Sequence, residues 1–125
     1  MRRIDLLSGI FWCLLLVSSC TSGISESPEV LFINPSLDSQ HNLDLELEVE
    51  IDISDDKMIM EYKFWLESEG GLAFFIDEKK LDKSHYRLMY TFDLSGHNPG
   101  DFTIHMDVKD YDGNRTSKYI DITGL

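Results

Sequence analysis

One stretch of this sequence, residues 43–53, alternates apolar and acidic side chains without interruption. Its odd-numbered positions are Leu, Val or Ile. Its even-numbered positions, here called the acidic ladder, are Asp44, Glu46, Glu48, Glu50 and Asp52. An extended strand points successive side chains to opposite faces, whereas a helix would scatter the five carboxylates around its circumference. The stretch therefore predicts a β-strand with one face in the core and an acidic face outside.

Further strands are predicted along the chain after residue 28. Apolar runs or alternating patterns occupy residues 29–34, 58–67, 72–76, 85–94, 101–109 and 116–123. Between them we expect a polar turn at residues 54–57, a charged loop at 77–84 and a loop with Gly and Pro at 95–100. The even-numbered residues of the strand at 58–67 are predicted to face the core, which leaves Trp65 outward or at an edge. About seven strands, with helix confined to the first residues, predict an all-β fold, an antiparallel β-sandwich.

The first twenty residues have the pattern of an export signal. Arg2 and Arg3 precede an apolar run at residues 6–17, which has signal-peptide length and is short for a bilayer span. The sequence VSSC at residues 17–20 follows and resembles the lipobox of bacterial lipoproteins. In that family the cysteine is lipidated and becomes the first mature residue, so the resemblance implies a membrane anchor on Cys20. The alternative is an ordinary secretory signal with a chance cysteine.

This resemblance also predicts the domain organisation and the location. The three parts are a cleaved signal helix at residues 1–19, lipidated Cys20 with a polar tether at residues 20–28, and the folded domain at residues 29–125. Because Thr21 follows the cysteine where aspartate would favour inner-membrane retention, the resemblance implies the outer membrane. Cys13 lies in the removed part, so no thiol would remain for a disulfide, a metal site or a nucleophile.

The charge of the chain limits its partners. The formal charge is −12, and removal of residues 1–19 takes away two arginines and one aspartate, which leaves −13. Phosphate contacts need clustered Lys and Arg, so this charge argues against binding nucleic acid or an anionic membrane surface. The sequence contains no HExxH motif and no glycine-rich phosphate loop. We therefore expect a protein that is not an enzyme.

A second resemblance covers the folded domain. Residues 99–114 read PGDFTIHMDVKDYDGN and precede the last predicted strand, while Asn34-Pro35 ends the first one. This pattern resembles bacterial immunoglobulin-like domains of the PKD, cadherin-like and fibronectin III type. Over residues 29–125 the chain also resembles small immunoglobulin-like lipoproteins of Gram-negative bacteria. The resemblance implies an immunoglobulin-like sandwich and says little about activity, because such sandwiches support many functions.

The acidic ladder has two interpretations. In an immunoglobulin-like sandwich its strand lies beside the strand at 85–94, whose outward residues include His85 and Arg87. Cross-strand charge pairs would then make the ladder a solvated face, each pair contributing about 0.2 to 1 kcal/mol. The alternative is a surface for cations or a basic partner, because the carboxylates outnumber the nearby basic side chains.

Four aspartates form a candidate calcium site, namely Asp55, Asp56, Asp110 and Asp112. The resemblance places their two loops at the same end of the sandwich, and calcium needs several oxygen ligands in one small volume. The alternative is structural. Asp110 would cap its own loop by accepting backbone N–H bonds, while Gly113 or Asn114 takes a positive φ.

Three rings form a candidate ligand-binding face, namely Trp65, His105 and Tyr119. By the resemblance their strands lie side by side, and the alternation puts all three side chains on the outer face. Rings in a row suit a sugar or a partner protein, because flat apolar surfaces stack while polar neighbours orient. The alternative is that Trp65 covers a sheet edge or a loop.

These observations predict a lipid-anchored binding or adhesion module of the bacterial cell envelope that recognises a glycan or a partner protein. The second hypothesis is a calcium-dependent structural spacer, or an accessory subunit of a larger envelope complex. Calcium is the only cofactor that the sequence suggests. The lipid on Cys20 would attach the protein to the membrane. The sequence leaves the oligomeric state open.

Overall fold

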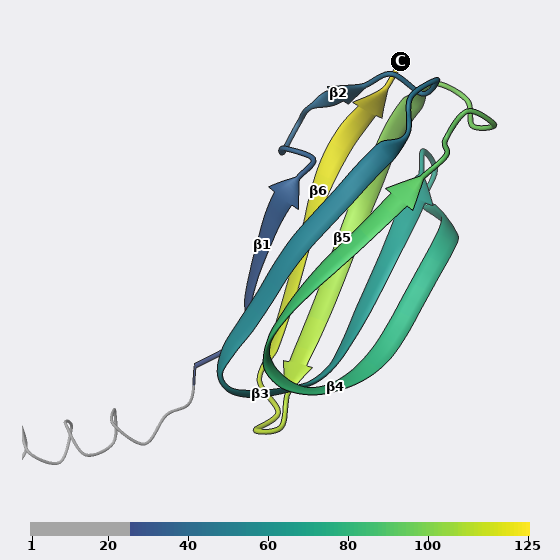
Figure 1. The fold of residues 1–125 in the computed structure, drawn as a ribbon. Helices are drawn as coiled ribbons and strands as arrows, with labels where there is room; N and C mark the ends of the chain where they lie inside the picture. Colours follow the sequence, from purple (N-terminus) through teal and green to yellow (C-terminus); the bar gives the residue numbers. More distant parts are fainter. Residues whose placement is uncertain (1–25) are drawn as a thin grey trace, which may run out of the picture.

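The computed structural model of the chain describes residues 26–125. The predicted signal at residues 1–19 and the lipidation site at Cys20 lie outside these residues. The described part contains six strands and no helix, and so no helix that could cross a membrane. The all-β prediction is confirmed (Figure 1). The strands are β1 (Glu29–Asn34), β2 (Gln40–His41), β3 (Leu47–Ser68), β4 (Leu72–Phe92), β5 (Gly100–Asp110) and β6 (Arg115–Gly124).

Two long strands, β3 and β4, define the architecture. They pair antiparallel, and both bend at the lower end of the molecule in Figure 1, so each contributes to two layers. In the small layer, the first half of β3 pairs with β1 and with the second half of β4. In the large layer, the second half of β3 pairs with the first half of β4 and with β5, which pairs with β6. The result is an antiparallel β-sandwich whose two layers share two continuous strands.

The first strands connect the two layers along one side. Strand β1 belongs to the small layer and ends at Asn34, because Pro35 has no N–H to continue the ladder. The chain then reaches β2, which pairs parallel with the end of β6 in the large layer. Lys118 Nζ of β6 also donates to the carbonyl of Val30 in β1 at 3.1 Å. These contacts hold the β1 and β6 edges of the sandwich together.

The core lies between the inward faces of the two layers. Its large, fully buried side chains include Ile51, Ile53, Phe64, Leu66, Leu88, Phe102, Ile104 and Met106. Phe64 of the large layer stacks on Tyr90 of the small layer, with 5.4 Å between ring centroids and 3° between planes. Full burial of one such apolar side chain contributes about 1.5 to 3 kcal/mol. Packing between the layers is therefore the main source of stability.

Two predicted interruptions of the strands are wrong. Residues 54–57 are not a turn, and residues 77–84 are not a loop, because β3 and β4 continue through them. Strand β3 bends through irregular pairing between Ser54 and Ile59 instead of breaking. Strand β4 has β3 as its pairing partner and is therefore an edge strand, where charged side chains reach solvent and are tolerated. Two pairs of predicted strands are therefore continuous in the structure, as β3 and β4, and the short strand β2 was not predicted. The structure has six strands over residues 26–125 where seven were expected.

The facing of side chains differs from the prediction near the bend. Ile59 is fully buried, whereas Met58, which was expected in the core, is 50% exposed. The pairing shifts register between Ile59 and Glu61, and a shift of one residue reverses the faces of a strand. From Tyr62 onward the predicted facing is confirmed.

The strand predicted at residues 43–53 begins later than expected. Strand β3 starts at Leu47, and the residues before it form a loop beside the end of β6. Leu43 still packs into the core, but Leu45 is 62% exposed. Alternation alone could not distinguish the paired part of this stretch from its loop, because the pattern continues through both.

Candidate functional site

A row of four side chains crosses the outer face of the large layer. Ile76 of β4, Trp65 of β3, His105 of β5 and Tyr119 of β6 stand directly opposite one another in the strand register, and we call this row the aromatic rung. The two sequence neighbours of Trp65 are fully buried, so the alternation of the strand points Trp65 outward. The structure therefore brings together the three rings predicted from the sequence.

The rings of the aromatic rung contact one another. Trp65 stacks on His105 with 4.5 Å between ring centroids and 2° between planes. His105 lies 5.8 Å from Tyr119 at an angle of 36°. The ammonium of Lys63 lies 5.1 Å from the centroid of the Trp65 ring, in cation–π geometry. The indole ring is therefore already engaged by neighbours within the protein.

The two ends of the aromatic rung are more open to solvent than its centre. Tyr119 is 63% exposed and Ile76 is 56% exposed, whereas Trp65 and His105 are half-buried. Trp65 points outward as predicted but does not lie at a sheet edge, because β4 and β5 flank its strand. Ile76 was missed, since the short apolar run that contains it does not alternate and gives no sign of which residue faces outward.

Glu67 fixes the orientation of the two central rings. Its Oε1 accepts a hydrogen bond from Trp65 Nε1 at 2.9 Å, and its Oε2 lies 3.2 Å from His105 Nε2. The indole N–H holds the pKa of Glu67 below its usual range, and His105 acts in the same direction. The carboxylate therefore remains charged at neutral pH and holds both rings on the outer face.

The charges on this face differ on the two sides of the aromatic rung. Toward the bend, the strand register places Glu61 in one row with three cations, Lys80, Lys109 and Arg115. We call these three cations the basic end. On the opposite side we call three carboxylates the acidic end: Glu67, Asp101 and Asp121. The face thus carries both signs of charge near the bend, with cations in slight excess, an apolar row in the middle and carboxylates at the far end of the strands.

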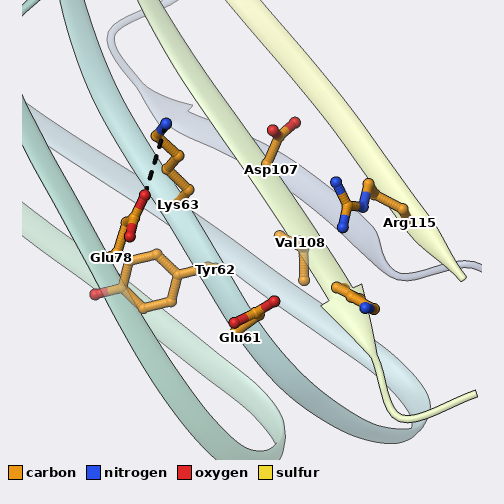
Figure 2. Close-up of a pocket in the computed structure, with 8 residues that line it drawn as sticks. Glu61, Tyr62, Lys63, Glu78, Asp107, Val108 and Arg115 are labelled. Atoms are coloured by element: carbon orange, nitrogen blue, oxygen red, sulfur yellow. Dashed lines mark ion pairs between the residues drawn. The ribbon is translucent and has the colours of Figure 1, made fainter. Parts of the chain in front are cut away.

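A pocket of ≈ 190 Å³ lies next to the basic end (Figure 2). Its charged lining residues are Glu61, Lys63, Glu78, Asp107, Lys109 and Arg115. Lys63 Nζ lies 3.6 Å from Glu78 Oε1, and Figure 2 shows Asp107 and Arg115 on the neighbouring strands. Acidic and basic side chains alternate around this pocket, so it could bind either a cationic or an anionic group.

A depression of ≈ 430 Å³ lies at the acidic end. Its charged lining residues are Asp38, Glu67, Glu69, Asp101 and Asp121, and none of the described residues that line it is basic. Thr103 Oγ1 donates to Asp121 Oδ1 at 2.7 Å, which orients one of these carboxylates. The depression therefore presents negative charge directly beside the aromatic rung.

The part of the acidic ladder that belongs to β3, namely Glu48, Glu50 and Asp52, lies on the outer face of the small layer, away from the aromatic rung. Arg87 of β4 lies 3.3 Å from Glu50 and 3.6 Å from Asp52, and His85 Nε2 lies 2.6 Å from Asp52. The predicted pairing of this strand with the strand at residues 85–94 is confirmed over residues 85–92. The inner part of the ladder is therefore a cross-strand charge network, as the first interpretation expected.

The structure brings the four aspartates of the predicted calcium site to one end of the sandwich without arranging them around a common point. Asp110 is buried and caps its turn, because Oδ1 accepts from Asn114 N at 2.8 Å and Oδ2 from Asn114 Nδ2 at 3.0 Å. Asp112 lies 2.9 Å from Lys57 Nζ. Within residues 26–125 no group of three or more His, Cys, Asp or Glu side chains is placed to hold a metal. Calcium binding stays a prediction, and the geometry favours the structural alternative for Asp110.

The pKa of Asp55, one of these four aspartates, is shifted by its surroundings. Desolvation raises its pKa, and the neighbouring Asp56 and Asp110 act in the same direction. The ionised form of Asp55 is therefore less favourable in the folded protein than in the unfolded chain.

A tyrosine network that the sequence did not indicate links the two layers. Tyr62 and Tyr90 donate to Asp77 Oδ2 at 2.7 and 2.6 Å, and Tyr86 stacks on Tyr62 at 5.8 Å. Burial, followed by the bond to Asp77, raises the pKa of Tyr90 to about 12 and also raises that of Tyr62. Asp77 was assigned to a loop, so its inward direction could not be predicted.

Comparison with known proteins identifies the fold. The chain is similar to the fibronectin(III)-like modules of Clostridium thermocellum CbhA, with a TM-score of 0.51, 17% identity, and coverage of 81% of this chain and 47% of that chain. It is similar to OgpA of Akkermansia muciniphila, with a TM-score of 0.51, 14% identity, and coverage of 80% and 30%. CopC from Methylosinus trichosporium OB3b gives a TM-score of 0.48, 11% identity, and coverage of 77% and 93%.

These likenesses show the fold alone. The domain has an immunoglobulin-like β-sandwich fold, similar to that of fibronectin III-like modules, as the sequence resemblance implied. It spans less than half the length of the CbhA structure. No protein-family model matches the chain, and no curated protein matches its sequence.

Proposed function

We propose that this chain is a lipid-anchored binding or adhesion module of the bacterial cell envelope, and that the outer face of the large layer takes its ligand. The observation that carries the proposal is the aromatic rung, which places Ile76, Trp65, His105 and Tyr119 in one row across four strands. The VSSC sequence at residues 17–20 supports the anchor, and Thr21 supports the outer membrane.

The rung has the composition of a binding hot spot. Tyr and Trp are enriched among the residues that dominate interface energetics, and such residues are commonly ringed by polar groups that exclude water. Here Tyr119 and Ile76 expose apolar surface at the two sides of the sheet, and charged side chains flank the row along the strands. This arrangement supports recognition on a flat surface.

A partner protein fits this face better than a glycan. Stacking on a sugar needs an open ring face, but the Trp65 ring is engaged by His105 and by Lys63. Tyr119 offers the most exposed ring surface of the row, and Ile76 offers aliphatic surface. An aliphatic and aromatic row within a charged surround is typical of a protein interface, including that of an accessory subunit in a larger envelope complex.

The proposal assigns no catalysis to the domain. The described groups with the largest pKa shifts, Tyr62 and Tyr90, owe them to burial and to the structural bond with Asp77. Asp110 is buried, and its carboxylate caps the turn that follows β5. These three residues therefore have structural roles, and the binding face does not depend on them.

Replacement of Tyr119 tests the proposal. The wild-type domain, Tyr119→Ala and Tyr111→Ala are compared on a glycan array and against purified envelope proteins by surface plasmon resonance. Tyr111 is the matched control, because it is 57% exposed and lies in the turn after β5, away from the aromatic rung. We expect Tyr119→Ala to weaken binding by about tenfold or more, as hot-spot truncation does, and Tyr111→Ala to bind normally. Equal binding by all three proteins would refute this face as the site.

A further inference from the structure

We propose that the partner that fits the aromatic rung is a second copy of this chain, packed face to face about a two-fold axis that runs along the rung. The inference rests on the proposed function, since it names the partner for the same face. It makes the module a homophilic one. The order of charges along β3 and β5 supports this packing.

On β3 and on β5, side chains of opposite charge lie on the two sides of the aromatic rung. On β5, Asp101 lies four residues before His105, and Lys109 lies four residues after it. On β3, Lys63 and Glu67 lie two residues to either side of Trp65. Both of these pairs therefore place opposite charges at equal distances from the aromatic rung, whereas Glu61 and Glu69, four residues to either side of Trp65, carry like charges.

A two-fold axis along the rung matches these charges between two copies. The rotation reverses the strand direction and keeps each strand opposite its own equivalent. Asp101 then faces Lys109 of the second copy, and Glu67 faces Lys63 of the second copy. Because the interface is symmetric, each pair occurs twice. The acidic end of one copy thus covers the basic end of the other.

Other arrangements of two copies are less favourable. An axis parallel to the strands would place the acidic end on the acidic end and would bring Lys80 opposite Arg115. That axis would also pair Glu61 with Lys109 and Lys63 with Asp107, but the like charges at its two ends offset these attractions. The axis along the rung brings one like-charged pair together, Glu61 and Glu69, whereas the axis parallel to the strands brings like charges together at both ends, so the charges favour the axis along the rung.

The centre of this packing is apolar. The aromatic rung of one copy lies on that of the other, which covers the exposed surfaces of Tyr119 and Ile76. Four strands about 4.8 Å apart and eight residues of about 3.4 Å each cover about 500 Å² per copy. A total near 1,000 Å² is at the lower end of specific interfaces, so we expect a weak and reversible dimer.

The overall charge does not prevent this association at physiological salt. The formal charge of −12 repels two copies at long range. At about 0.15 M ionic strength the Debye length is about 8 Å, so distant charges are screened while facing pairs are not. The dimer should therefore strengthen as salt rises from low ionic strength, and then weaken when salt screens the facing pairs.

A charge exchange on β5 tests the inference. The mature chain with Cys20→Ser, which keeps every residue of the described fold, is studied by sedimentation equilibrium up to about 1 mM. We expect a reversible dimer that Asp101→Lys weakens about tenfold or more, because the introduced ammonium would face Lys109 of the other copy. The double variant Asp101→Lys with Lys109→Glu should restore the dimer. Within one copy the two positions are eight residues apart on an extended strand, about 27 Å, so rescue has to act between copies.

The controls separate this inference from the proposed function. Glu48→Lys makes the same change of charge on the small layer and should leave the dimer intact, since Glu48 is exposed on the opposite face. Thermal melting checks that each variant folds. A protein that stays monomeric at about 1 mM, or a double variant that fails to recover, overturns the inference. Binding of a glycan or another envelope protein that depends on Tyr119 would then still support the proposed function.

Discussion

Tyr62 and Tyr90 donate to the same oxygen, Oδ2 of Asp77, from opposite layers of the sandwich. Asp77 lies in the first half of β4, opposite Phe64 of the large layer, and its carboxylate reaches Tyr90 of the small layer. A single acceptor thus connects the two halves of the fold. This relationship is a non-local one, because Asp77 is separated from Tyr62 by 15 residues and from Tyr90 by 13.

Replacement of Asp77 should destabilise the domain. Asp77→Ala leaves two partly buried hydroxyl groups without their acceptor, and we expect a loss of about 1 to 3 kcal/mol in the free energy of unfolding. Urea denaturation measures it. Asp82→Ala is the matched control, because Asp82 is exposed on the same strand and accepts from the exposed Tyr111. Equal effects of the two substitutions would show that the network does not stabilise the fold.

Stability should fall in the alkaline range. A tyrosine in the unfolded chain loses its proton near pH 10, whereas burial keeps Tyr90 protonated to about pH 12. Between these values the unfolded state binds fewer protons than the folded state, so the free energy of unfolding falls as pH rises. Urea denaturation at several pH values from 9 to 12 measures the slope. The slope should become shallower in Tyr90→Phe, and an unchanged slope would contradict the assignment.

Truncation of Trp65 should affect stability as well as binding. The ring is half-buried and stacks on His105, so Trp65→Ala should cost about 1 to 2 kcal/mol, whereas the more exposed Tyr119→Ala should cost less than about 0.5 kcal/mol. Thermal and urea denaturation of both variants provide the measurement. If Trp65→Ala is as stable as the wild type, the stack does not order the face.

Removal of the Asp55 charge should stabilise the protein at neutral pH. Its pKa is raised in the fold, so the free energy of unfolding falls as pH rises from the pKa of the unfolded chain to that of the folded protein, and the charged form carries the penalty above both. Asp55→Asn should therefore melt at a higher temperature than the wild type at pH 7, and the two should converge near pH 3. A melting temperature that rises with calcium in the wild type, but not in Asp55→Asn, would instead favour the calcium hypothesis.

Cys20 should determine membrane attachment. If the VSSC sequence is a lipobox, the wild-type protein incorporates labelled palmitate and sediments with the membrane fraction of a Gram-negative cell. Cys20→Ser should do neither, while Cys13→Ser should behave as the wild type because Cys13 lies in the removed signal. Membrane attachment of Cys20→Ser would show that the segment is not a lipoprotein signal.

The candidate face was predicted better than the candidate metal site for a physical reason. Trp65, His105 and Tyr119 lie on strands with clear alternation, and the alternation assigns a face to each side chain. The four aspartates lie at a bend and a turn, where no periodic rule assigns direction. Their proximity was predicted, but the engagement of Asp112 with Lys57 and of Asp110 with its own turn depends on the folded backbone.

The sequence by itself determined the all-β class, the core face of most strands and the outward direction of Trp65. These properties follow from a period of two, which is local and can be read from neighbouring residues. The tertiary structure decided that β3 and β4 run unbroken between the layers, that Ile76 completes the aromatic rung, and that opposite charges lie on either side of it. Those features depend on which strand pairs with which, and strand pairing is set by packing between residues that are far apart in the chain.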